Sequence, residues 1–446
     1  MTIALIKTLQ VILALSILIL IHEFGHFIFA KIFGIRVDKF YLFFDAGDKK
    51  IFSTKTGWFT KLCPKAAQWE TEYGIGWLPL GGYCKIAGMI DESMDTEHLK
   101  TEPQPWEFRT KPAWQRLLVM AGGVLFNFIL AIIMYTSLLA GWGESYISNK
   151  GNRIYVNELA SEMGFRNGDE ILRFDDYVPE SFTMLQADLV RNSTEKVTVL
   201  RDGDTASFHI DQTLFGEVMN SPGMFDLAVP FVVKEISANS PNSALGLEKG
   251  DRIACISGNE VDFVQDAWPI LKDLRGTEGP VTVIRGSDTL DLEMAVDTAG
   301  RLGVFLMQPE ITTKEYTVLS AIPAGFRKTF ASIGDYLKDL KLVATPSTEA
   351  YKSVGSFIAI GQIFPSAWDW YSFLNIIALL SIMLGVMNLL PIPALDGGHI
   401  VFTLYEIITG RKPSDKFLYI TQIIGMLLIF GLMFLAFGND IARLIR

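Results

Sequence analysis

The sequence predicts a polytopic α-helical membrane protein with four transmembrane helices and two small, mostly-β domains inserted between helices 2 and 3. Two observations predict this fold class. The chain of 446 residues is 50% hydrophobic and only 20% charged, and its apolar residues form four stretches long enough to cross a bilayer at about 1.5 Å per residue. Between the second and third stretches, a β-rich pattern occurs twice at an offset of 82 to 84 residues.

The predicted membrane spans cover about residues 8–31, 117–143, 370–395 and 417–439. Between Lys7 and Lys31 the only formal charge is Glu23, and the other three stretches contain none. A cleaved signal peptide would explain the first stretch alone. That stretch contains His22 and His26, however, and no A-x-A-like cleavage site follows it. We therefore expect it to be a span.

The distribution of charge predicts an orientation and excludes one class of partner. The formal net charge of -10 argues against binding to nucleic acid. Residues 144–369 contain 20 Lys and Arg against 33 Asp and Glu. By the positive-inside rule, basic residues at the opposite span ends, such as Arg36, Arg116 and Lys412, place that side in the cytoplasm. The acidic insert and both termini are then expected on the outer side.

The insert between the second and third spans contains an internal repeat. GFRNGDEI at 164–171 matches GLEKGDRI at 246–253, and VTVLRDGDT at 197–205 matches VTVIRGSDT at 281–289. Short β-branched strands separated by Gly-Asp turns predict two copies of one mostly-β module, at residues 144–220 and 221–311. The pattern resembles PDZ domains, which bind extended peptides by strand addition and capture terminal carboxylates. Rigid spacers without a peptide ligand are the alternative.

Residues 312–369 are expected to form an amphipathic helix and a connector. Apolar residues at 326, 330, 333, 337 and 340 share one face of a helix over 323–345. This helix is expected either to pack on the second module or to lie at the membrane surface near the third span.

The pattern with the clearest chemistry is His22-Glu23-Phe24-Gly25-His26, an H-E-x-x-H in the first span. On a helix the two imidazoles share one face and can bind a single tetrahedral Zn²⁺, while Glu23 beside them takes a proton from water. Ionisable groups inside a span are costly and usually face a cavity with partners. A structural His/Glu cluster and the ion site of a transporter are the alternatives.

A catalytic zinc site needs a third protein ligand, and the end of the third span offers a candidate. The sequence NLLPIPALDGGH at 388–399 places two prolines just before Asp396. Broken backbone at membrane depth is tolerated only where it is buried in protein or lines a watery cavity, so we expect a cavity beside Asp396. Of the other histidines, His98 lies in a polar loop, His209 in a strand-like part of the insert, and His399 just after Asp396.

With H-E-x-x-H in the first span, N-x-x-P-x-P-x-L-D-G-G in a late span and a PDZ-like insert, the chain resembles the site-2 protease family of intramembrane zinc metalloproteases, specifically the bacterial RseP type with tandem PDZ domains. The resemblance implies a set of functional residues: His22, His26 and Asp396 as zinc ligands, Glu23 as general base, and Asn388 and Pro391 as contacts to the substrate backbone. His399 is not in the implied ligand set.

Two further segments resemble the same family. Gly123 to Asn127 in the second span resembles its G-x-x-x-N, in which the glycine allows close helix approach and the asparagine bonds across the bundle. YGIGWLPLGGYCK at 73–85 resembles its membrane-re-entrant β-hairpin, expected over about 70–88. The free edge of that hairpin, at Gly81, Gly82 and Tyr83, would pair with an unwound substrate; an ordinary soluble hairpin is the alternative. FYLFFD at 40–45 departs from the glycine-rich run that the family often has there.

The resemblance implies a zinc metalloendopeptidase, with Zn²⁺ as cofactor, that cuts single-pass membrane proteins inside the lipid bilayer after prior trimming. Anti-sigma factors and signal-peptide remnants are the implied substrates of this regulated intramembrane proteolysis. The implied location is the bacterial inner membrane, with the PDZ-like insert outside and the active site toward the cytoplasm. A metal-ion or proton transporter would show more polar residues across several spans, and a catalytically silent PDZ scaffold would not need both motifs.

Overall fold

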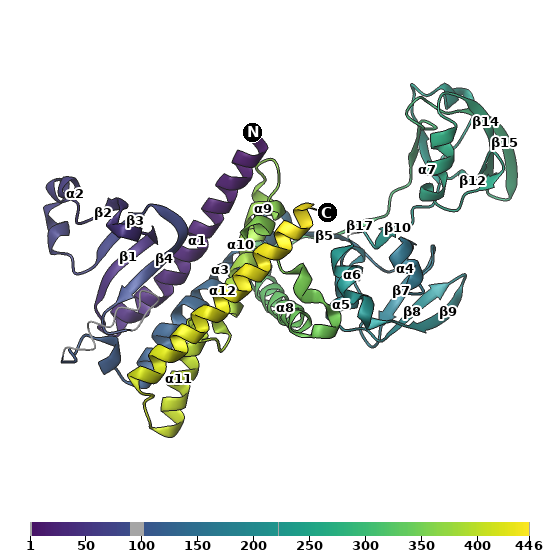
Figure 1. The fold of residues 1–446 in the computed structure, drawn as a ribbon. Helices are drawn as coiled ribbons and strands as arrows, with labels where there is room; N and C mark the ends of the chain where they lie inside the picture. The colour runs from purple at the N-terminus through teal and green to yellow at the C-terminus, as the bar shows by residue number, and fades with distance from the viewer. Residues whose placement is uncertain (1, 90–101, 222, 446) are drawn as a thin grey trace. The chain divides into compact units, whose positions relative to one another are not determined.

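The computed structural model describes residues 2–89, 102–221 and 223–445, so His98 lies outside the described residues. The chain divides into two compact units (Figure 1). The membrane unit comprises Met1–Gly143, Glu315–Lys341 and Val354–Arg446. The insert unit comprises Glu144–Lys314 and Leu342–Ser353.

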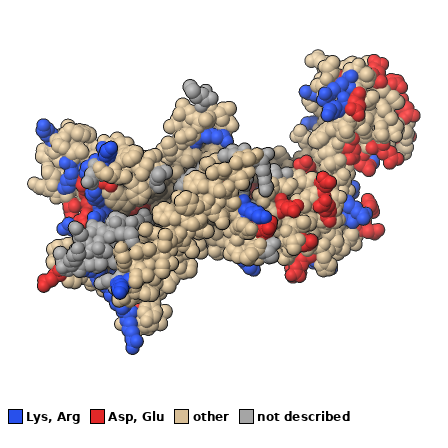
Figure 2. Space-filling view, in the orientation of Figure 1, with Lys and Arg blue, Asp and Glu red and all other residues tan. Residues whose placement is uncertain are grey.

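Among the residues that the structure describes, four helices of the membrane unit are long and apolar enough to cross a membrane. They are α1 (Thr2–Ile32), α3 (Ala113–Trp142), α10 (Trp370–Leu389) and α12 (Asp415–Ile445). All four overlap the predicted stretches, as expected for a polytopic membrane protein. Figure 2 shows the surface over α12 almost free of charged side chains, whereas acidic side chains gather over the insert.

The third of these helices is shorter than the predicted span of 370–395. α10 ends at Leu389, and an irregular loop leads to α11 (Asp396–Thr409). Pro391 and Pro393 in that loop explain the early end, because proline lacks the N–H that a helix needs and disfavours the helical conformation of the residue before it. Asp396 therefore begins a new helix and does not lie at the end of α10.

The central helix of the membrane unit is α3, which packs against α1, α10 and α11. Where α1 crosses α3, Gly25 lies against the backbone of Gly122, and a Cβ atom on either glycine would overlap the other helix. Small residues of this kind let two helices approach closely within a membrane. Apolar side chains fill the contact between α1, α3 and α10 farther along, among them Leu18, Leu130 and Ile377.

A four-stranded sheet follows α1, and its pairing differs from the predicted hairpin. Its strands are β1 (Val37–Phe44), β2 (Lys50–Ser53), β3 (Glu72–Gly76) and β4 (Leu78–Ile86), in the order β2-β3-β1-β4. β1 pairs with β3 in parallel and with β4 in antiparallel orientation. The two strands of the expected hairpin over 70–88 are present, but β1 lies between them.

The connection between β3 and β4 is too short for a hairpin, because only Trp77 separates the strands and a hairpin loop needs about two residues or more. The chain instead passes around the end of β1. There Gly76 lies against the backbone of Phe43 and Phe44, where a Cβ atom would overlap it. Phe43 has a φ of 67° and marks a β-bulge in β1. The aromatic run that departs from the family pattern is thus an inner strand of the sheet.

The predicted amphipathic helix is α8 (Val318–Ala344), and it packs on α3. Ala321 and Ala324 contact Leu139 of α3, and Ile333 and Leu340 pack against the same helix farther along. Within the described residues, the packing partner of this helix is therefore a helix of the membrane unit. The rest of its predicted apolar face is exposed, namely Phe326 (47%), Phe330 (61%) and Leu337 (49%).

The insert unit contains two modules built on antiparallel sheets. The first has β6 (Ile154–Val156), α4 (Glu158–Glu162), β7 (Glu170–Phe174), α5 (Leu185–Arg191), β8 (Lys196–Arg201), β9 (Asp204–His209), α6 (Phe215–Asn220) and β10 (Phe225–Leu227). The second has β11 (Val233–Ile236), β12 (Arg252–Ile256), β13 (Asn259–Glu260), α7 (Val264–Asp273), β14 (Glu278–Arg285), β15 (Asp288–Ala295) and β16 (Val304–Leu306).

The first and last strands of the insert form a two-stranded ribbon. They are β5 (Glu144–Ile147) and β17 (Ile311–Lys314), which pair in antiparallel orientation with Glu144 opposite Lys314. In the described part of the chain, the membrane unit also contains α2 (Gly57–Leu62), which follows β2, and α9 (Phe357–Ile363), which precedes α10.

The repeated sequence forms the same ion pair in both modules. Arg201 donates to both carboxylate oxygens of Asp169 and to the carbonyl of the glycine five residues before it. Arg285 does the same with Asp251 in the second module. Each arginine ties the end of a long strand to the Gly-Asp turn. In each module, the Gly-Asp segment and the strand that ends in arginine therefore contact each other through this ion pair.

The core of the first module extends beyond residue 220, where the sequence suggested a boundary. β10 pairs with β6, and Met224 is fully buried in the same core. Leu342 and Ala350, which fall in the expected connector, also lie in that core. The chain therefore returns to the first module after α8, a long-range contact that the local sequence pattern does not encode.

Candidate metal centre

α1 carries both histidines of the H-E-x-x-H motif on one face. His22 and His26 are four residues apart, so they lie one turn from each other on the helix. Their side chains are 12% and 8% exposed, respectively. Two imidazoles therefore meet in a nearly enclosed part of the membrane unit.

The broken segment after α10 brings Asp396 to these histidines. Backbone hydrogen bonds fold the segment tightly, from Ile392 N–H to the carbonyl of Leu390 and from Leu395 N–H to that of Ile392. Ala394 has a φ of 81°, which non-glycine residues seldom adopt. Asp396 follows as the first residue of α11, and its side chain is 15% exposed.

Three glycines hold the broken segment in place. Gly397 lies against the carbonyls of Leu389 and Leu390, and Gly398 lies against the backbone of Pro393. From α12, Gly425 contacts the same proline backbone, and a Cβ atom at any of the three positions would overlap main-chain atoms. Steric crowding thus explains both glycines of the L-D-G-G sequence, since only a residue without a side chain fits at either position.

The ligand atoms of His22, His26 and Asp396 form a nearly equilateral triangle. The two Nε2 atoms are 3.3 Å apart, and they lie 3.4 Å and 3.3 Å from Oδ2 of Asp396. Ligands about 2.0–2.1 Å from a tetrahedral ion are about 3.3–3.4 Å from one another. Oδ2 of Asp396 is also buried without a hydrogen-bond partner among the described residues. The donor set and its spacing fit a zinc ion.

α3 contacts the Nδ1 atom of each histidine, on the side of the ring away from the Nε2 atom in the triangle. His26 Nδ1 donates to the carbonyl of Val119 at 2.8 Å, and the side-chain amide of Asn127 lies 3.1 Å from Nδ1 of His22. Between them Gly123 faces the rings, where a Cβ atom would overlap Nε2 of His26. Contacts of this kind fix the tautomer and orientation of metal-ligating histidines.

Sequence reasoning missed the support from Val119, because a backbone carbonyl has no signature in the sequence. From the sequence, Asn127 and Gly123 are predicted only to form a helix-packing motif. The signal that connects them to the histidines is their spacing: residues 119, 123 and 127 recur every four positions and share one helix face.

The other residues that the sequence analysis named lie outside this triangle. Glu23 follows His22 directly on α1 and is half-buried. Asn388 lies in the last turn of α10, and Pro391 is exposed in the loop before Asp396. Gly81, Gly82 and Tyr83 lie on β4. His399, in the first turn of α11, and His209, at the end of β9, are not in the metal-binding group found among the described residues.

On β4, the three predicted residues have different surroundings. Gly82 lies against Ile19, one turn before His22 on α1, and a Cβ atom there would overlap that side chain. Tyr83 donates a hydrogen bond to Asp45 at 2.9 Å and stacks on Tyr41. The side chain of Tyr83 is therefore engaged within the sheet, and only its backbone is at the sheet edge.

A family model described as peptidase family M50 matches residues 10–432, a range that contains the two histidines, Glu23 and Asp396. The chain belongs to peptidase family M50. The predicted membership of the site-2 protease family is thereby confirmed.

Two relatives cover almost the whole of this M50 peptidase. It is 27% identical to the "Putative zinc metalloprotease" of Xylella fastidiosa, over 96% of this chain and 97% of the relative. It is 28% identical to the "Regulator of sigma-E protease RseP" of Salmonella typhimurium, over 97% of this chain and 98% of the relative. The predicted enzyme class, a metalloprotease, and the predicted cofactor, Zn²⁺, are confirmed by these similarities.

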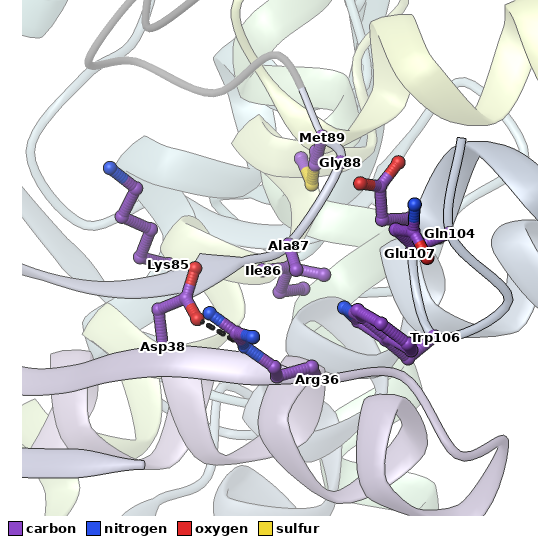
Figure 3. Close-up of a pocket in the computed structure, with 10 residues that line it drawn as sticks. All are labelled: Arg36, Asp38, Lys85, Ile86, Ala87, Gly88, Met89, Gln104, Trp106 and Glu107. Atoms are coloured by element: carbon purple, nitrogen blue, oxygen red, sulfur yellow. Dashed lines mark hydrogen bonds and ion pairs between the residues drawn. The ribbon is translucent and has the colours of Figure 1, made fainter. Parts of the chain in front are cut away.

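The M50 peptidase also has a cavity of about 280 Å³ at the start of β1 and the end of β4 (Figure 3). None of the three metal-centre residues lines it. Figure 3 shows Arg36 paired with Asp38 through two atoms that lie 2.7 Å apart. Glu107 in the same lining pairs with Arg109, which lies outside the lining. The cavity is therefore separate from the metal centre.

Proposed function

We propose that His22, His26 and Asp396 are the zinc ligands of this peptidase and that Glu23 is its general base. The triangle of ligand atoms carries the proposal. Its sides of 3.3, 3.3 and 3.4 Å suit three corners of a tetrahedral site. The fourth corner is then available for water or substrate, as catalytic zinc requires.

When bound, a zinc ion polarises the scissile carbonyl and lowers the pKa of the attacking water to about 7. Glu23 accepts the proton of that water and delivers it to the nitrogen of the leaving amine. Its place directly after His22 on α1 supports this role. The small exposure of the ligand side chains, 8–15%, supports a site from which bulk water is largely excluded, where electrostatic interactions are stronger.

The substrate is proposed to be a membrane span bound in extended form. The carbonyls of a helix are engaged in hydrogen bonds, so a span must unwind before it can be cut. β4 is an edge strand, and the contact of Gly82 with Ile19 brings it beside the turn of α1 that precedes His22. Pairing of the unwound substrate with the backbone at Gly81, Gly82 and Tyr83 would be strand addition.

Asn388 and Pro391 are proposed to contact the edge of the substrate backbone that does not pair with β4. Asn388 is half-buried, and its amide has no hydrogen-bond partner among the residues that the structure describes. Pro391 is exposed in the segment that leads to Asp396. An amide in this state can bind an extended peptide without first losing a bond of its own.

In the proposed biological role, the peptidase performs regulated intramembrane proteolysis of single-pass membrane proteins that have already been trimmed outside. Anti-sigma factors and signal-peptide remnants are the proposed substrates, and the printed name of the Salmonella relative, a regulator of sigma-E protease, supports the former. The proposed location is the bacterial inner membrane. There the two modules, as PDZ-like domains, would lie outside, and the metal centre would face the cytoplasmic side.

The proposal is tested by measuring zinc content and peptide cleavage on the same purified proteins. The full-length protein in detergent should contain about one zinc per chain, and His22→Phe and Asp396→Ala should lose most of it. Glu23→Gln should keep its zinc but cleave a model span peptide ~10²–10⁴-fold more slowly.

His399→Phe is the matched control, because His399 lies one turn after Asp396 and is not in the metal-binding group. It should keep its zinc. Full zinc occupancy in both ligand variants would show that the ligand set is wrong, and cleavage by Glu23→Gln at the unaltered rate would show that Glu23 is not the base.

A further inference from the structure

The two proposed histidine ligands differ in what holds them. His26 Nδ1 lies 2.8 Å from the carbonyl oxygen of Val119. A carbonyl can only accept a hydrogen bond, so Nδ1 carries the ring proton, and Nε2, which faces Asp396, keeps its lone pair. The main chain alone therefore fixes the tautomer of His26.

The partner of His22 is a side chain. The amide of Asn127 lies 3.1 Å from Nδ1 of His22, and its nitrogen is the nearer atom. In that orientation the amide would donate to Nδ1, and the proton of a neutral ring would have to sit on Nε2. That atom lies 3.4 Å from Asp396 Oδ2 and 3.3 Å from His26 Nε2, where a ligand needs its lone pair.

Turning the amide by 180° resolves this conflict. The oxygen of Asn127 is buried and has no hydrogen-bond partner in the described part of the chain, so the turn costs no bond of the oxygen. The hydrogen bond between the amide nitrogen and His22 is replaced by one between the amide oxygen and His22. Amide oxygen and nitrogen are nearly isosteric and are assigned from the surrounding hydrogen bonds. After the turn the oxygen accepts from Nδ1–H, and Nε2 of His22 is free to bind metal.

The position of Asn127 is itself well determined. Its side chain is completely buried, and its backbone carbonyl accepts a hydrogen bond of 2.7 Å from Ser381 of α10. On α3 it shares a face with Val119 and Gly123, at intervals of four residues. On that face the carbonyl of Val119 accepts a hydrogen bond, Gly123 leaves room for the rings, and the side-chain oxygen of Asn127, once turned, is a second acceptor.

We propose that Asn127 is a positioning residue whose side-chain oxygen accepts a hydrogen bond from Nδ1 of His22 and so fixes the tautomer in which Nε2 binds zinc. This inference rests on the proposed ligand role of His22. Without the acceptor, Nδ1–H would lose its hydrogen bond to the side chain of Asn127 in an almost enclosed site, and the metal-binding tautomer would be stabilised less. Removing such a partner typically weakens metal affinity 10- to 100-fold.

Two substitutions separate an acceptor from a donor or a packing residue. Asn127→Leu has nearly the same shape but no hydrogen-bonding atom, and Asn127→Asp keeps only acceptors. Zinc affinity is measured on the full-length protein in detergent by competition with a chelator. We expect Asn127→Leu to bind zinc about 10- to 100-fold more weakly and Asn127→Asp to stay within about threefold of the unaltered protein.

Ser381→Ala is the matched control, because it removes the neighbouring contact between α3 and α10 without touching a histidine. It should bind zinc within about threefold of the unaltered protein. Zinc binding by Asn127→Leu at the unaltered affinity would overturn the proposal. An equal loss in Asn127→Leu and Asn127→Asp would also overturn it, because the nitrogen or the packing would then be what matters.

A measurement on the unaltered protein guards against variants that fail to fold. The chain has only five histidines, so ring ¹⁵N labelling with His22→Phe as the assignment control reports which nitrogen of His22 is protonated. Nδ1 should be protonated in the zinc-loaded protein, and a bare Nδ1 would overturn the proposal. If His22→Phe itself keeps zinc, the ligand set fails; if it loses zinc while Asn127→Leu does not, only the role of Asn127 fails.

Discussion

Gly123 of α3 occupies the place where the two imidazole rings approach the helix backbone. Gly123→Ala should therefore weaken zinc binding about tenfold or more without removing any ligand, because the added Cβ atom would overlap Nε2 of His26 and the ring of His22. Chelator competition on the purified protein measures the effect.

Gly141→Ala is the control on the same helix, since a Cβ atom there meets no other atom within 4 Å. It should leave zinc affinity unchanged and should slightly favour the helix. Equal zinc affinity in the two variants would mean that the rings can move away from α3 without losing the metal, and that Gly123 serves helix packing alone.

At the scale of residues, the sequence predicted the histidine pair and Glu23 from helical spacing, and it predicted a break near Asp396 from two prolines. It could not show that Asp396 reaches the histidines, because that contact depends on how α11 packs against α3. The three glycines that hold the loop, Gly397, Gly398 and Gly425, likewise have a purpose that only the packed backbone reveals.

The strand ends of the insert modules offer a test at the scale of elements. Asp251→Asn should destabilise the second module by about 1–3 kcal/mol, because the buried carboxylate accepts from Arg285 and from the backbone N–H of Glu248. Limited proteolysis or hydrogen exchange of that module measures the change. Asp262→Asn is the matched control, since the pair of Asp262 with Arg252 is exposed and should contribute little.

The effect of Asp251→Asn should also depend on pH. Hydrogen bonds from Arg285 lower the pKa of Asp251 below its ordinary value of 3.8. The ionised carboxylate therefore stabilises the fold above pH 3.8, and this contribution is lost as the pH falls through the lower pKa of the folded state. The difference between the two proteins should shrink in acid; a difference that stayed constant or grew would contradict the role given to this ion pair.

Among the elements, the strands themselves could be predicted from aromatic and β-branched runs, but their partners could not. The segment over 70–88 reads as a hairpin because its two strands are adjacent in sequence. The structure places β1 between them, since a single connecting residue cannot form a hairpin turn, and β1 pairs with both strands. Pairing between distant strands leaves no local signal.

At the scale of the whole molecule, the insert is predicted to control access to the metal centre and to be unnecessary for peptide-bond chemistry. Every residue proposed for that chemistry lies in the membrane unit. A chain in which a short flexible linker replaces residues 145–313 should therefore bind zinc and should cut untrimmed substrates that the complete protein excludes. A short linker is sufficient because Glu144 and Lys314 lie opposite each other in the pair of β5 and β17.

The deletion needs one further change, because Leu342 packs into the core of the first module and would be exposed without it. Leu342→Gln is added to the shortened chain, and the complete chain with Leu342→Gln is the control. Cleavage is measured on trimmed and untrimmed forms of one membrane-anchored substrate. A folded, zinc-loaded deletion variant that no longer cuts even the trimmed form would favour capture of the new C-terminus by the modules instead.

The number of spans and the β-rich insert were predictable at this scale. Hydropathy and an internal repeat are properties of long segments, so a wrong assignment of a few residues does not change either prediction. The return of the chain to the first module at Leu342 and Ala350 was not. It joins residues that lie on either side of α8, and nothing in the local composition marks them as partners.

The ribbon of β5 and β17 has a consequence for how the membrane unit folds. Leu139 of α3 and Ala321 of α8 are in contact, yet the whole insert separates them along the chain. The entropy lost in closing a loop grows with the logarithm of its length, so this contact is unfavourable to form early. Once β5 has paired with β17, Glu144 and Lys314 are neighbours, and α3 is joined to α8 as if by a tight turn. If the modules fold first, a contact between distant residues becomes a contact between neighbours, and the packing of α8 on α3 then depends on whether the insert has already folded.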